Sequence, residues 1–140
     1  IAVLGRIPGS QHFRNVERYK VETIPGALFI RIDERLFFGN LAAVEQRLTQ
    51  ELQKADGTTD LVLVMSAVNL MDATAVEVFC ELNADLATRQ IRLHLAEVKG
   101  PVQDRLQRSA LWSALSGKVF LSTNEAYETL RPTPGWCPDI

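Results

Sequence analysis

The stretch from Leu61 to Leu86, LVLVMSAVNLMDATAVEVFCELNADL, decides the fold of this chain. It opens with five consecutive apolar residues, 61–65, a run that is typical of a strand buried on both faces. Asp72 then precedes a helical pattern that places five apolar residues on one face: Ala75, Val76, Phe79, Leu82 and Leu86. The stretch therefore predicts a buried strand, a short loop and an amphipathic helix whose first turn is capped by the Asp72 carboxylate.

The same residues resemble the STAS domain, a module of sulfate transporters and anti-sigma-factor antagonists. In that family an apolar strand is followed by iDssG or a related phrase, and this chain has Met71-Asp72-Ala73-Thr74-Ala75 in that place. In the antagonists the residue after the aspartate is a serine that a partner kinase phosphorylates. Ala73 has no hydroxyl, so we expect no phosphorylation there, and the resemblance favours the transporter branch.

Length and composition predict a single ordinary domain. The chain has 140 residues, of which 46% are hydrophobic and 23% charged, and a net charge of −2 that gives no footprint for nucleic acid. No apolar run approaches the about 20 residues of a membrane-spanning helix, and no signal peptide is recognised. Cys80 and Cys137 lie in unlike contexts, which favours free thiols over a bridge. Because the chain begins without methionine, we expect it to be a domain of a larger protein.

Three regions are predicted along the chain. Residues 1–18 lack periodicity and indicate a linker with at most a short strand. Their phrases Leu4-Gly5-Arg6, Pro8-Gly9 and Arg14 through Tyr19 resemble the segment that joins the last membrane helix to the STAS domain in sulfate permease (SulP-type) transporters. Residues 19–131 form the STAS domain, and residues 132–140 form a flexible tail.

Within the domain we expect strands at 19–22 and 27–32, joined as a hairpin by the turn at Pro25-Gly26. Leu36-Phe37-Phe38-Gly39-Asn40 again resembles the SulP-type pattern, and Asn40 is a natural N-cap for a helix to about Lys54. A strand from Gln90, a helix from Gly100-Pro101, a short strand at 119–121 and a last helix capped by Ser122 follow. This order predicts an α/β fold, a STAS-like mixed sheet of four to five strands with four to five helices packed against it.

The candidate ligand or partner loop follows the two central strands, where α/β folds usually bind ligands. Its residues are Asn69, Asp72, Thr74, Lys99 and Gly100. The helix starts at Asp72 and Gly100 offer unpaired amides and the positive end of a helix dipole, which predicts weak binding of a nucleotide or another anion. Asp72 is nevertheless explained by capping alone, and Thr74 by its place in a first helical turn.

A second candidate surface is the acidic stripe of Glu77, Glu81 and Asp85, which is either a solvated face or a partner surface. The sequence contains no phosphate-binding loop, no dinucleotide fingerprint and no metal-ligand spacing. His94 is expected to be a half-exposed strand residue. Ser66, His94 and Asp72 are the residue types of a catalytic triad, but a triad is recognised by its geometry, which the sequence does not give. We therefore expect no catalysis, cofactor or metal.

The resemblance implies the cytoplasmic STAS domain of a SulP-type anion transporter, at the inner side of the cell membrane. Such a domain is a non-catalytic regulatory and protein-interaction module. Its implied partners are the transmembrane domain of the same transporter and cytosolic regulatory proteins, and a homodimer of the full-length transporter is compatible with it. The alternative is a free-standing anti-sigma-factor antagonist that binds a regulatory kinase, against which Ala73 and the linker argue.

Overall fold

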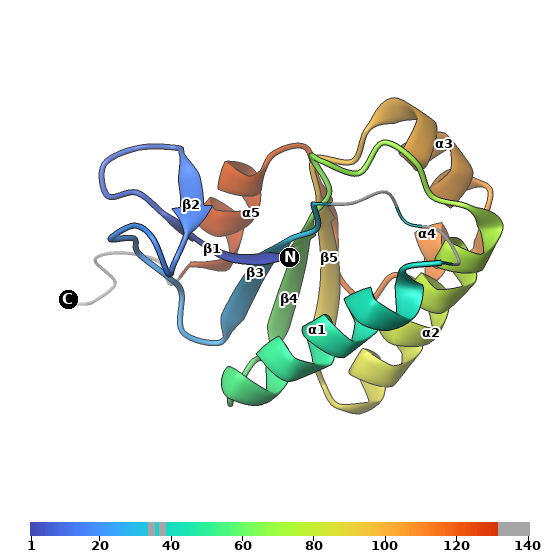
Figure 1. Cartoon of the computed structure of the whole chain (residues 1–140), viewed down its shortest axis with the longest axis horizontal. Coiled ribbons are helices and arrows are strands. Elements are labelled where there is room, and N and C mark those ends of the chain that lie inside the picture. Colours follow the sequence, from blue (N-terminus) through green and yellow to red (C-terminus); the bar gives the residue numbers. More distant parts are fainter. Residues whose placement is uncertain (34–35, 37–38, 132–140) are drawn as a thin grey trace.

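The computed structural model describes residues 1–33, 36 and 39–131, which form one mixed sheet of six strands (Figure 1). The strands lie in the order β2-β1-β3-β4-β5-β6. Strands β3 to β6 run parallel, whereas β1 is antiparallel to both of its neighbours. Their bounds are Ala2–Arg6 (β1), Phe13–Asn15 (β2), Ala27–Arg31 (β3), Asp60–Val64 (β4), Arg92–Ala96 (β5) and Val119–Phe120 (β6).

Five helices in the described residues cover the two faces of the sheet unequally. Helices α1 to α4 pack on one face around the larger apolar core, and α5 packs on the opposite face around the smaller one (Figure 1). Their bounds are Leu41–Lys54 (α1), Ala73–Thr88 (α2), Gly100–Gln107 (α3), Ala110–Ala114 (α4) and Thr123–Leu130 (α5).

Strand β4 contributes to both cores, as its unbroken apolar run predicts. All five of its residues are buried; Leu61 and Leu63 belong to the larger core, while Val62 and Val64 belong to the smaller. Because successive side chains point to opposite faces, a strand covered on both sides needs apolar residues at nearly every position. The central strand of the prediction is confirmed.

The predicted helix starts are also confirmed. The Asp72 carboxylate accepts a hydrogen bond from the backbone amide of Ala75 at 2.8 Å, so Asp72 is the N-cap of α2. Ser122 caps α5 in the same way. Gly26, with φ of 85°, supplies the left-handed conformation expected at the turn before β3. The fold class inferred from the sequence is therefore correct.

The sheet has six strands, more than the four to five predicted. The additional strand pairing is at the edge formed by the N-terminal residues of the chain. Residues 1–18 supply β1 and β2, and β3 pairs with β1 rather than with residues 19–22. The predicted strand 19–22 makes one bridge, between Glu22 and Arg6. Gly5 permits this crossing, since a Cβ there would overlap the Val21 side chain and the Glu22 carbonyl.

That residues 1–18 also connect to a membrane domain stays a prediction. Phe37, Phe38, Cys137 and the predicted tail 132–140 lie outside the described residues.

Candidate functional site

The loops that follow β4 and β5 lie beside each other at the carboxyl ends of these strands. Lys99 Nζ donates a hydrogen bond to Asn69 Oδ1 at 2.8 Å, and both side chains are exposed. Gly100, also exposed, is the first residue of α3. The structure thus brings three of the five predicted loop residues together.

The other two loop residues belong to the start of α2. Asp72 holds the cap described above, and Thr74 lies half-buried in the first turn. A cap of this kind contributes about 1 kcal/mol to stability, so the position of Asp72 has a structural explanation. Ligand binding by this loop stays a prediction.

A hollow of about 200 Å³ lies between the first turn of α2 and the segment joining α3 to α4. Ala73 and Val76 line it on one side, and Arg105, Arg108 and Ser109 on the other. Neither arginine makes an ion pair with any residue that the structure describes. Two guanidinium groups that make no ion pair within the described residues therefore line the hollow near the start of α2.

This arrangement suits an anion better than the predicted loop residues alone do. The free amides at the start of α2 and the planar donors of Arg105 and Arg108 all favour negative charge. The Asp72 carboxylate opposes it and already occupies one amide. Sequence reasoning missed the two arginines, because their spacing on α3 and just beyond it predicts only a solvated helix face.

The acidic stripe on α2 is exposed at all three predicted positions, Glu77, Glu81 and Asp85. Asp85 pairs with Arg89 one turn further on, at 3.7 Å. An exposed pair of this spacing contributes only a few tenths of a kcal/mol. The structure confirms that these side chains are exposed, and their use as a partner surface stays a prediction.

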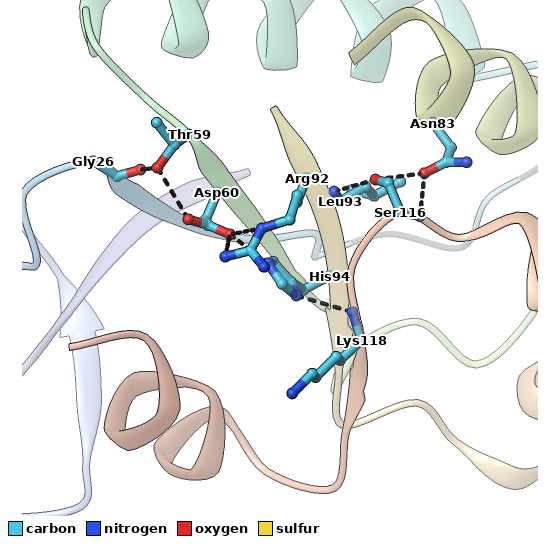
Figure 2. A network of polar contacts seen from close by, with 9 residues as sticks. All are labelled: Gly26, Thr59, Asp60, Asn83, Arg92, Leu93, His94, Ser116 and Lys118. Atoms are coloured by element: carbon cyan, nitrogen blue, oxygen red, sulfur yellow. Dashed lines mark hydrogen bonds and ion pairs between the residues drawn. The ribbon is translucent and has the colours of Figure 1, made fainter. Parts of the chain in front are cut away.

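A polar cluster that sequence reasoning missed lies on the face covered by α5, with Asp60 and His94 buried and Arg92 exposed at its edge (Figure 2). His94 is 1% exposed, and its Nε2 lies 2.7 Å from Asp60 Oδ1. Arg92 Nε donates to the same carboxylate oxygen at 2.9 Å. The expectation that His94 is half-exposed is wrong, because the polar side of β5 faces a second core.

The hydrogen bonds of His94 indicate its protonation state. Its Nδ1 accepts from the backbone amide of Lys118 at 3.0 Å, which leaves Nε2 to carry the proton and donate to Asp60. Burial lowers the pKa of His94, and this outweighs the opposing effect of the Asp60 carboxylate. Burial alone would raise the pKa of Asp60, but the hydrogen bonds from His94 and Thr59 and the charge of Arg92 lower it.

The register of β4 and β5 explains how this cluster forms. Asp60 stands opposite Arg92, and Val62 opposite His94, so the four residues share the face toward α5. The only sequence signal is an aspartate at the start of a buried strand together with two basic residues at alternate positions of the next. The cluster joins β4, β5 and the start of β6, which is a structural role.

A second buried contact joins α2 to the segment between α4 and β6. Asn83, which is 5% exposed, donates to the Ala114 carbonyl at 2.9 Å and accepts from the Ser116 amide at 3.0 Å. The Ser116 hydroxyl also accepts from the Leu93 amide of β5. The buried face of α2 thus includes Asn83, which the predicted apolar face did not contain, whereas the predicted Leu82 is only half-buried.

The structure does not assemble a catalytic triad of Ser66, His94 and Asp72. Both ring nitrogens of His94 are used by Asp60 and Lys118, while Asp72 caps a different helix. Within the described ranges, no group of three or more His, Cys, Asp or Glu side chains is placed to hold a metal ion. In the same part of the chain, no helix is both long and apolar enough to cross a bilayer.

Comparison of the sequence with known proteins gives consistent matches. The family model described as the STAS domain matches residues 18–126. High affinity sulfate transporter 2 of Stylosanthes hamata is 32% identical over 142 aligned positions, which cover 94% of this chain and 22% of the transporter. Sulfate transporter 3.1 of Arabidopsis thaliana is 33% identical and is matched over 91% of this chain and 21% of its own length. The chain spans about a fifth of these curated relatives.

Solved structures support the same fold. The murine Solute Carrier 26 family member A9 anion transporter superposes with a TM-score of 0.82 at 16% identity, over 91% of this chain and 21% of the transporter. A putative anti-sigma factor antagonist of Thermotoga maritima gives a TM-score of 0.67 at 18% identity, over 79% of this chain and 92% of that protein. At these identities the two structures show the shared fold alone.

Proposed function

This chain belongs to the STAS domain family, and we propose that it is the cytoplasmic regulatory module of a SulP-type sulfate or anion transporter. The observation that carries the proposal is the match to sulfate transporters along nearly the whole chain, which covers only a fifth of each of them. In this proposal the anion crosses through a separate membrane domain, and the STAS domain acts through protein contacts without catalysis.

The acidic stripe of α2 is the proposed contact surface for a membrane domain or a cytosolic partner. Glu77 and Glu81 are exposed and, among the described residues, make no ion pair, so a basic surface can approach them without breaking an existing contact. The regulatory effect would then depend on these charges.

Charge reversal in the full-length protein tests this role. Glu77→Lys with Glu81→Lys should change sulfate uptake per transporter at the cell surface at least twofold, whereas Glu45→Lys, an exposed acid on α1, should not. Uptake of labelled sulfate and surface abundance would be measured together. Equal behaviour of the double variant and the Glu45 control would refute the surface, and a full reading frame without apolar membrane segments would refute the transporter.

We also propose that the hollow beside Ala73 binds a nucleotide or a smaller anion weakly. Its support is the pair of uncommitted guanidinium groups, Arg105 and Arg108, beside the start of α2. A nucleotide titration followed by backbone amide shifts should move residues 69–76 and 97–109. Arg105→Gln with Arg108→Gln should reduce the affinity, while Arg47→Gln on α1 should not. Shifts confined to the acidic stripe would contradict the proposal.

The alternative function is a free-standing anti-sigma-factor antagonist, which the fold similarity to the Thermotoga maritima protein favours. Ala73 argues against it, because the chain has no hydroxyl at the family's serine position. Mass spectrometry after incubation with antagonist-type kinases distinguishes the two proposals. Phosphate on Thr74 would favour the antagonist, and an unmodified chain is expected of the transporter module.

A further inference from the structure

A larger hollow, of about 300 Å³, lies on the α5 side of the sheet, away from the proposed nucleotide site. It is bounded by the segment before and within β2, the carboxyl ends of β3 and β4, the residue after β5 and the start of α5. Figure 1 shows β2 and α5 on the same side of the molecule, and Phe13 of β2 contacts the Tyr127 ring of α5 at 5.7 Å between centroids. The polar residues lining the hollow include His12, Arg14, Arg31, Ser66, Glu97 and Thr123.

Glu97, the acidic residue that lines the hollow, already accepts hydrogen bonds within the fold. Glu97 Oε2 accepts hydrogen bonds from both the amide and the hydroxyl of Thr123, at the start of α5. Glu97 has φ of 58°, an uncommon conformation for a residue other than glycine. The positive end of α5 therefore offsets the carboxylate charge, which weakens its repulsion of an anion in the hollow.

The arginines and the serine that line the hollow keep hydrogen-bond donors that no other described residue uses. Arg14 Nη1 donates to the Phe13 carbonyl at 2.8 Å, and within the described residues Arg14 makes no ion pair. Arg31 pairs with Asp33 through Nε, which leaves its terminal nitrogens as donors. The Ser66 hydroxyl has no hydrogen-bond partner in the described part of the chain. Donors from β2, β3 and the end of β4 thus converge on one space.

We propose that this hollow binds a small tetrahedral oxyanion, sulfate or phosphate. Arg14 and Arg31 supply the charge and the planar donors that match such oxygens, and Ser66 supplies a neutral donor. The site lies at the carboxyl ends of parallel strands, where α/β sheets commonly bind ligands. Because different residues form it, the proposal is independent of the hollow beside Ala73.

To test this, the isotope-labelled 140-residue chain would be titrated with sodium sulfate, and separately with sodium phosphate, while its backbone amide shifts are recorded. Sodium chloride at equal ionic strength serves as the reference. The expected result is saturable shifts at residues 12–14, 31, 66 and 97 with at least one oxyanion and not with chloride. Arg14→Gln should weaken that binding about tenfold, the effect of losing one charged hydrogen-bond donor.

Two matched controls separate a site from general charge screening. Arg18→Gln changes an exposed arginine four residues from Arg14 that does not line the hollow, and Arg105→Gln changes the other proposed site. Both should leave unchanged the sulfate or phosphate affinity that is read from the shifts of residues 12–14, 31, 66 and 97. Equal shifts with chloride, equal weakening by Arg18→Gln and Arg14→Gln, or no saturable shift with either oxyanion would each overturn the proposal.

Discussion

Acidification from pH 7.5 to pH 5 should destabilise the folded chain through one buried side chain, His94. In the fold the ring is neutral, with Nδ1 accepting from the Lys118 amide and Nε2 facing Asp60. Protonation would place a second N–H against the Lys118 amide at 3.0 Å and remove that hydrogen bond. It would also charge a ring that is 1% exposed.

The direction of the effect follows from the lowered pKa of His94 in the fold. The unfolded chain binds a proton near pH 6.5, while the folded chain resists it until a lower pH. The stabilisation is therefore present above pH 6.5 and is lost as the pH falls toward the folded pKa. Its slope in that window is at most about 1.4 kcal/mol per pH unit, which gives a loss of about 2 kcal/mol at pH 5 if the folded ring stays neutral.

Urea unfolding at half-unit intervals between pH 5 and 7.5 measures this slope. The chain has two histidines, which provides a matched pair of variants. His94→Gln should lower stability at every pH and flatten the slope, whereas His12→Gln, at an exposed position, should preserve it. An unchanged slope in His94→Gln, or its loss in His12→Gln, would refute the assignment of the effect to the buried cluster.

Three further substitutions test the helix cap and the close packing at glycine by urea unfolding. Asp72→Ala should cost about 1 kcal/mol by leaving the Ala75 amide without its cap, and an unchanged midpoint would show that the cap is not needed. Gly117→Ala should cost more than about 2 kcal/mol, because its Cβ would overlap the Leu93 carbonyl and the His94 ring, whereas Gly100→Ala, with open space around it, should change stability by less than about 0.5 kcal/mol. Equal costs of the two glycine substitutions would contradict the close approach at Gly117.

Local pattern was enough to predict the elements whose sequence and environment agree. The run 61–65 is apolar because β4 is covered twice, and Asp72 caps α2 with a bond that needs only residues of its own turn. A short strand was allowed within residues 1–18, but the position of β1 and its pairing were not predicted, because Gly5 and Arg6 suggest a loop. Both residues are explained by distant contacts: Gly5 lies under Val21, and the Arg6 guanidinium stacks on Tyr127 at 4.0 Å.

The strand that begins near Gln90 was predicted, but the burial of its polar side was not. Sequence reasoning expected His94 to be half-exposed, since polar residues on a strand usually mark a solvated face. Helix α5 comes after all four parallel strands, β3 to β6, and packs on that side of the sheet, which no local pattern predicts. The histidine is buried because a carboxylate from β4 and a backbone amide before β6 satisfy both of its ring nitrogens.

The proposed anion sites show the same limit for function. The sequence identified the segment after β4, and that segment contributes Ser66 to one hollow and leads to Ala73 in the other. It did not identify the cations, because Arg14 and Arg31 come from different strands and Arg105 and Arg108 from the end of α3, far in sequence from the start of α2. Their convergence depends on the packing of β2 and α3 beside the carboxyl ends of the strands. A charge pattern along the chain therefore predicts where a helix start can attract an anion, whereas the tertiary structure determines which guanidinium groups can bind it.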